Sequence, residues 1–191
     1  MEPTTTYPEN RVQPSPAAVS VKGGIITGII SAILTIVFIY VLNNLGEGTL
    51  QIILQVVTAA IGIFLTQKAF KDQGDGYMSY GKGLLIAIIT MAVAGLLAGI
   101  VNFVYINFVD PTIPGQIVDA TIETTYEMTE RFGGDVDAVE AQFEGKREEM
   151  VEQQKSVINI LWAVVGSVVF GLIIGLIVTI FTKNTPPEPE F

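Results

Sequence analysis

The chain has 191 residues, half of them hydrophobic, with a mean hydropathy of +0.53 and a formal net charge of −9. A negative net charge disfavours binding to nucleic acid, whose phosphates select basic surfaces. The chain has no cysteine and no histidine, which excludes disulfides, thiolate nucleophiles, Cys-ligated metals and the commonest general base near neutral pH. We therefore expect a protein that is not an enzyme and that carries no cofactor or metal.

The composition of the first 21 residues predicts a disordered cytoplasmic tail. They contain Pro3, Pro8, Pro14 and Pro16 among Thr, Ser and Glu, and such a segment has too little apolar surface to offset its chain entropy. It does not resemble a cleavable signal, because no basic region opens the chain.

Four uncharged runs are predicted to cross a membrane as helices, at about 25–42, 50–66, 84–108 and 157–181. A helix over 84–108 reaches about 37 Å, which exceeds the ~30 Å thickness of a bilayer core. Helical structure is nearly obligatory there, since each exposed amide in hydrocarbon costs several kcal/mol. The second run is short and holds Gln51 and Gln55, so a re-entrant or interfacial helix is the alternative for it. The third run is expected to end at Asp110-Pro111, because proline disfavours helical geometry in the residue before it.

Residues 110–156 form the only sizeable segment outside these runs. They carry twelve acidic and four basic residues, a local net charge of −8. Apolar residues recur at three- and four-residue spacing, Gly133-Gly134 interrupts them, and Asp137 with Glu140 resembles a capping box. We predict an all-α fold, a four-transmembrane-helix bundle over 22–183 with an amphipathic helical hairpin inserted between helices 3 and 4 and a flexible tail at 184–191. The second hairpin helix is expected to continue into the last span without a break.

Basic residues close to the predicted spans indicate the orientation. With four spans, one side of the membrane receives Lys22, Lys68, Lys71, Lys82 and Lys183. Lysine and arginine near span ends favour the cytoplasm, while acidic residues contribute little. Both termini are therefore predicted to be cytoplasmic, with the acidic hairpin outside.

Two short motifs flank the third span, Met78-Ser79-Tyr80-Gly81-Lys82-Gly83 before it and Phe108-Val109-Asp110-Pro111 after it. With the charged insert and a last span ending in lysine, they resemble DUF4199, a family of small bacterial membrane proteins. The resemblance covers roughly Lys22 to Lys183. It implies a multi-pass protein of the bacterial inner membrane, and it supplies no catalytic residue because the family has no established activity.

Small residues repeat at four-residue spacing within the predicted spans, which lets helix backbones approach closely in lipid. They provide either a dimer face or packing within one four-helix bundle. The repeats comprise Gly24 and Gly28, Gly95 and Gly99, Gly171 and Gly175, and more weakly Thr58 and Gly62.

Two polar features remain as candidate sites. Asn102 and Asn107 in the third span are either interhelical hydrogen-bonding residues, at about 0.6 kcal/mol per bond, or part of a polar transport path. Four glutamates at four-residue spacing form a second candidate site: Glu140, Glu144, Glu148 and Glu152. They provide either a solvated acidic face or a face that binds a partner or, weakly, a divalent cation, since Ca²⁺ and Mg²⁺ prefer oxygen ligands. Arg147 and Lys155 would offset part of the repulsion between the four carboxylates.

The sequence thus predicts a non-catalytic membrane protein of unknown process, embedded in a lipid bilayer. It would act through helix packing and through an acidic hairpin that binds a second copy or another membrane protein. The alternative is a small oligomeric transporter or channel. Its polar residues would be Gln51, Gln55, Asn102 and Asn107, and these are few for a permeation route.

Overall fold

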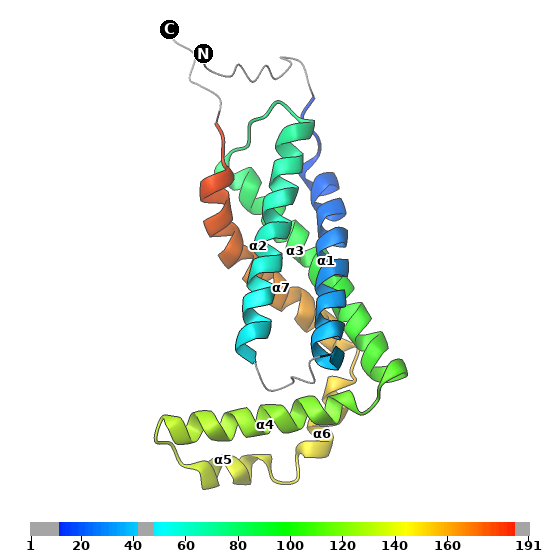
Figure 1. Ribbon diagram of the computed structural model, residues 1–191, viewed down its shortest axis with the longest axis vertical. Helices are drawn as coiled ribbons and strands as arrows, with labels where there is room; N and C mark the ends of the chain where they lie inside the picture. Colours follow the sequence, from blue (N-terminus) through cyan, green and yellow to red (C-terminus); the bar gives the residue numbers. More distant parts are fainter. Residues whose placement is uncertain (1–11, 42–47, 186–191) are drawn as a thin grey trace.

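The computed structural model describes residues 12–41 and 48–185, and within them four long helices form a bundle (Figure 1). The predicted all-α membrane architecture is confirmed, because all four helices have the length and apolar composition that a bilayer crossing needs. The bundle helices are α1 (Pro16–Val41), α2 (Gly48–Gln73), α3 (Tyr80–Val104) and α7 (Ile158–Thr182), and a π-helical turn, η1 (Tyr105–Val109), continues α3.

The first helix begins earlier than predicted. Pro16 occupies the first helical position, where its missing N–H costs nothing, and Val19 is buried against α2 and α3. Gln13 is also held: its Nε2 donates to the carbonyl oxygen of Tyr77 (3.2 Å), and its Oε1 accepts from Lys82 Nζ (2.8 Å). The prediction of a disordered tail was therefore wrong for residues 16–21. Residues 1–11 lie outside the described part.

The second helix is one uninterrupted helix of 26 residues, so a re-entrant segment does not describe it. It extends to Gln73, through residues expected to form a polar connection. The extension is stabilised by burial, because Gln67 and Phe70 face the bundle interior. The side chain of Gln51 lies outside the described part.

The third helix lies between α1 and α7 and packs on both along its length. On the α1 side, glycines permit this approach. A Cβ added at Gly24 would lie 2.6 Å from the carbonyl oxygen of Thr90, and one at Gly28 would lie 3.0 Å from the Cα of Ala94. Larger residues at these positions would force the two backbones apart.

Glycines make the interface with α7 in the same way. Gly95 and Gly99 on α3 face α7, while Gly171 and Gly175 on α7 face α3. A Cβ at Gly171 would lie 2.5 Å from the Cβ of Met91. The six glycines singled out by their spacing therefore pack within the chain's own bundle.

Two apolar clusters form the core on the half of the bundle away from the insert. Both combine residues from α2 and α3. The first adds a residue of α7, and the second adds residues of α1 and of the α2–α3 connection, so the clusters fix the relative position of helices that are distant in sequence. One cluster is Ala59, Ile63, Ala87, Met91 and Ile174, and the other is Val19, Phe70, Met78 and Ile86.

The insert contains three helices, α4 (Ile113–Arg131), α5 (Val136–Phe143) and α6 (Arg147–Gln154). Helices α4 and α5 form a hairpin that lies across one end of the bundle and extends beyond it sideways (Figure 1). Gly133, with φ of +70°, makes the turn as the sequence indicated. The Tyr126 and Phe143 rings pack edge to face across the hairpin, with centroids 6.2 Å apart.

The second limb of the insert differs from its prediction, because it does not run unbroken into the last span. Gly145 has φ of +74° and separates α5 from α6. A second break precedes α7, where Asn159 Nδ2 donates to the carbonyl oxygens of Gln153 and Gln154 at the end of α6. The residue that caps α5 is Asp135, which accepts from the backbone N–H of Ala138, rather than the predicted Asp137.

Candidate functional site

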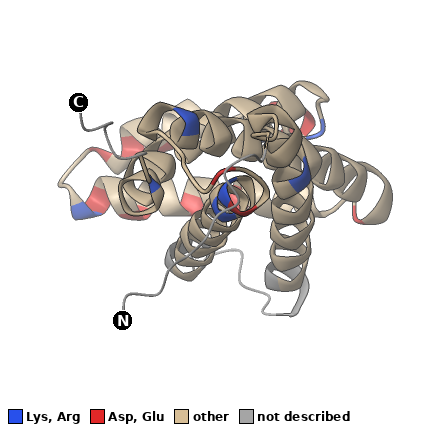
Figure 2. Ribbon diagram, turned by 90° about the horizontal axis from the view of Figure 1, so that it is seen from above, with Lys and Arg blue, Asp and Glu red and all other residues tan. Residues whose placement is uncertain are grey.

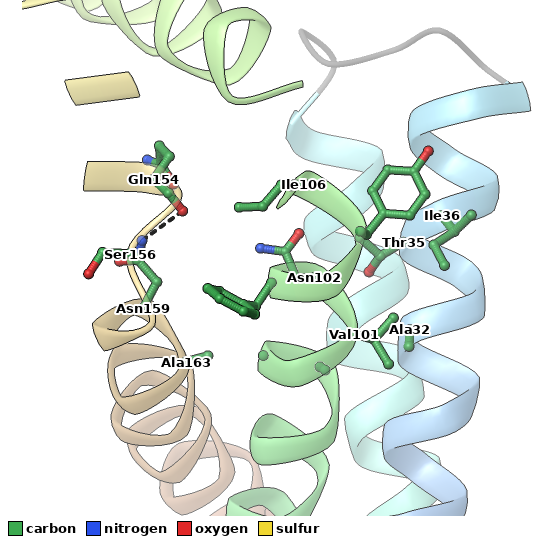
Figure 3. Close-up of a pocket in the computed structure, with 14 residues that line it drawn as sticks. Ala32, Thr35, Ile36, Val101, Asn102, Ile106, Gln154, Ser156, Asn159 and Ala163 are labelled. Atoms are coloured by element: carbon green, nitrogen blue, oxygen red, sulfur yellow. Dashed lines mark hydrogen bonds between the residues drawn. The ribbon is translucent and has the colours of Figure 1, made fainter. Parts of the chain in front are cut away.

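A cavity of about 220 Å³ lies at the insert end of the bundle, between α1, the end of α3 and the start of α7 (Figure 3). Its walls combine alanine and isoleucine side chains with uncharged polar groups. The labelled polar residues around it are Thr35, Asn102, Gln154, Ser156 and Asn159.

The two candidate asparagines of α3 and η1 have different roles. Asn107 Nδ2 donates to the carbonyl oxygen of Phe103 (2.9 Å) and to that of Lys155 (3.3 Å), so it joins the third span to the segment before α7. Asn102 lines the cavity, and within the described residues its side chain makes no hydrogen bond to the protein. Among the described residues, Asn107 therefore contacts a segment outside its own helix, while neither asparagine forms a hydrogen bond to another membrane-spanning helix.

A second cavity of about 410 Å³ continues toward the middle of the bundle. It shares Thr35, Ala98 and Ala163 with the first cavity, and we call the two together the chamber. Three further polar side chains line its inner part: Ser31, Gln55 and Ser167. Among the described residues, the side chains that line the chamber include no charged group, so the chamber suits water or a neutral, hydrogen-bonding solute.

Toward the opposite end of the bundle the chamber is closed. The apolar cluster around Ile63, Ala87 and Ile174 comes first. Beyond it lies Gln67, which is 0% exposed. Gln67 is eight residues beyond Ala59, a residue of the chamber wall, and therefore about 12 Å further along α2.

The Gln67 side chain makes three hydrogen bonds to two other helices. Its Nε2 donates to the carbonyl oxygen of Gly83 (2.9 Å) and to the Thr179 hydroxyl (2.8 Å), while its Oε1 accepts from the Thr182 hydroxyl (2.5 Å). Lys71 Nζ adds a hydrogen bond to the carbonyl oxygen of Thr182 (2.9 Å). This network, which we call the Gln67 cluster, joins α2, α3 and α7, and the sequence analysis missed it.

A signal for the cluster is present in the sequence, although a weak one. Thr179 and Thr182 lie three residues apart in an otherwise apolar run, which places both hydroxyls on one helix face. Gln67 follows directly after the second apolar run. Because that run ends at Thr66, composition alone places Gln67 in the connection between two helices.

The acidic insert is held to itself by one ion pair among the described residues. Arg147 donates to both carboxylate oxygens of Asp119, from Nε at 2.6 Å and from Nη2 at 2.7 Å. This bidentate contact lowers the pKa of Asp119 below its usual range. Arg147 was expected beside Glu144, but instead it fastens α6 to α4.

The predicted stripe of four glutamates does not form, because the chain breaks at Gly145. Glu140 lies on α5, Glu144 follows its last turn, and Glu148 and Glu152 lie on α6. Within residues 12–41 and 48–185, no three acidic side chains gather in a way that could hold a metal ion.

The hairpin instead presents a dispersed acidic surface (Figure 2). Two large apolar side chains stand exposed near its turn, Phe132 at 81% and Met128 at 54%. The end of α4 thus combines exposed apolar side chains with neighbouring acidic residues.

The four apolar helices define a multi-pass membrane protein. The family model described as "Protein of unknown function (DUF4199)" matches residues 22–184, so the chain belongs to this family, as the motifs around the third span indicated. No curated protein matches the chain, and no solved structure does.

Proposed function

We propose that this protein is a non-catalytic component of the bacterial inner membrane whose acidic hairpin binds a second copy or another membrane protein outside the cytoplasm. A non-catalytic role is supported by the lack of histidine and cysteine in the sequence.

The distribution of lysines supports this orientation. The start of α1, the connection between α2 and α3 and the end of α7 lie together at one end of the bundle. Backbone hydrogen bonds between Met78 and Asn184 join the connection to the end of α7, and Gln13 joins the segment before α1 to Tyr77. Five lysines lie at or near that end, and the hairpin lies at the other. Lysines beside span ends favour the cytoplasm, so both termini are assigned there.

The observation that carries the binding role is the projection of the hairpin beyond the bundle. The distal parts of α4 and α5 pack on each other through Tyr126 and Phe143, and they leave Phe132 exposed among acidic residues. A partner that buries Phe132 and supplies basic groups complements this surface.

The absence of cysteine makes a direct topology test possible. Single cysteines in place of Glu130, in the hairpin, and of Lys68, at the lysine-rich end, are treated in intact cells with a membrane-impermeant maleimide. We expect labelling of Glu130→Cys in intact cells and of Lys68→Cys only after lysis. The reverse pattern would refute the orientation.

The binding role is tested by site-specific photo-crosslinking in native membranes. A photoreactive amino acid at Phe132 should form an adduct with a second copy or with another protein. The matched control is the same amino acid at Phe181, which is also 81% exposed but lies at the end of α7 that is far from the hairpin. Equal yields at the two positions, or no adduct at Phe132, would refute the role of the hairpin.

The chamber favours a second candidate function, a transporter or channel for a small neutral solute. Asn102 and Gln55 face it without hydrogen-bond partners among the described side chains. If this function is correct, proteoliposomes should take up glycerol faster than empty liposomes. Ala98→Phe, which fills the chamber, should abolish the difference, while Leu96→Phe, on the exposed face of α3, should not. Equal uptake by proteoliposomes and empty liposomes would exclude the candidate.

A further inference from the structure

A groove of about 390 Å³ runs along the outside of the bundle between α1 and α2. It lies on the half of the bundle that is away from the hairpin, and none of the chamber's lining residues belongs to it. The α1 side of the groove extends from Val19 to Ile30. That is about 16 Å of helix, close to half the ~30 Å thickness of a bilayer core, so the groove matches one leaflet.

The floor of the groove is formed where the two helices come closest. Gly23 lies against Thr66, and Gly62 lies against Thr27. Both threonine hydroxyls are already bonded within their own helices: Thr27 Oγ1 donates to the carbonyl oxygen of Gly23 (2.8 Å), and Thr66 Oγ1 donates to that of Gly62 (2.7 Å). These two hydroxyls are therefore already satisfied, and a hydrocarbon chain can lie on the floor between them without depriving them of a partner. Thr58 and Gln73 are the other uncharged polar residues of the lining.

The walls are apolar and face outward. Ile26 and Ile30 form the α1 side and Ile61 and Leu65 the α2 side, and all four are exposed. The outward surface of a transmembrane bundle is bathed by lipid, so the occupant available to this groove is an acyl chain.

One end of the groove carries a charge. Lys22 is exposed there and is the only charged one among the described residues that line the groove. It lies at the lysine-rich end of the bundle, where a phosphate headgroup belongs when the acyl chain points toward the middle of the bilayer. Basic residues beside grooves between transmembrane helices select anionic headgroups.

We propose that the α1–α2 groove is a binding site for an anionic phospholipid, with one acyl chain on the Gly23–Gly62 floor and the phosphate at Lys22. The length of the groove, its apolar walls and its single terminal lysine fit such a lipid. The site does not depend on the function proposed for the hairpin or the chamber.

Native mass spectrometry of the purified chain with equal amounts of phosphatidylglycerol and phosphatidylcholine tests this proposal. We expect preferential phosphatidylglycerol adducts, and Lys22→Gln should reduce them about fivefold, the contribution of one lysine near a membrane surface. Lys68→Gln is the matched control, because Lys68 is exposed on α2 near the same end but does not line the groove. Equal binding of the two lipids, or equal losses in the two variants, would overturn the proposal.

The position of the acyl chain is tested by fluorescence quenching. This measurement needs no substitution that fills the groove and could impair folding of the protein. In a Trp162→Phe background, the fluorescence of Ile26→Trp should be quenched more by brominated phosphatidylglycerol than by brominated phosphatidylcholine at the same mole fraction. A tryptophan at Ile177, which is exposed on α7 outside the groove, should show no preference. Equal quenching by the two lipids at Ile26 would refute the site.

Discussion

Replacing Gln67 with methionine tests whether the Gln67 cluster stabilises the bundle. Methionine is similar in length but cannot form the three hydrogen bonds that the Gln67 amide makes to α3 and α7. Hydrogen bonds between transmembrane helices average about 0.6 kcal/mol and reach about 1.7 kcal/mol. The expected loss in free energy of unfolding is therefore about 2 kcal/mol.

The loss is measured by titrating the protein in detergent micelles with sodium dodecyl sulfate and following helix content by circular dichroism. The control is Lys68→Met, which introduces methionine at the neighbouring, exposed residue. It should change the free energy of unfolding by less than about 0.5 kcal/mol. A double-mutant cycle with Thr179→Val isolates the bond between the two side chains. If Gln67→Met and Lys68→Met are equally stable, or if the cycle gives no coupling, the cluster does not stabilise the bundle.

Three further predictions concern single positions. Thr90→Val should leave the free energy of unfolding unchanged or raise it by about 1 kcal/mol in the same titration, because the buried Thr90 hydroxyl has no hydrogen-bond partner among the described residues. A decrease of about 1 kcal/mol or more in the free energy of unfolding would contradict this prediction. Gly24→Ala should lower the free energy of unfolding by about 1–3 kcal/mol, because a Cβ there would lie 2.6 Å from a backbone oxygen of α3. The control Gly166→Ala places its Cβ in open space and should be neutral or stabilising. Equal effects of the two substitutions would refute the close approach of α1 and α3. The pKa of Asp119 is depressed by Arg147, so the ion pair contributes stability above the unfolded pKa of about 3.9 and loses it as pH falls through the lower folded pKa. Amide exchange in α6 should therefore accelerate below about pH 4 in the native chain but show no such step in Asp119→Asn.

The sequence was sufficient to predict the four spans and the hairpin turn. Uncharged runs have one viable structure in hydrocarbon, and Gly133-Gly134 marks a turn by composition alone. The prediction was wrong where tertiary contacts overrode local composition. Residues 16–21 were assigned to a proline-rich tail, but burial of Val19 and the proline at the first helical position extend α1 over them.

The candidate sites were harder to predict than the fold. The glutamate stripe assumed a continuous helix, and the positive φ of Gly145 ends that helix between the second and third glutamates. The Gln67 cluster depends on partners 112 and 115 residues away, and periodicity within a single helix carries no information about such pairs.

The Gln67 cluster also has a consequence for biogenesis. Two of the three groups that bond the Gln67 amide come from the last helix of the chain, so these bonds cannot form until the ribosome has released that segment. A nascent chain with only three inserted helices holds a partly unpaired amide within the bilayer and glycine faces on α3 that still lack their neighbour. We expect such an intermediate to be cleaved by membrane proteases more readily than the four-helix chain, in which these groups are paired.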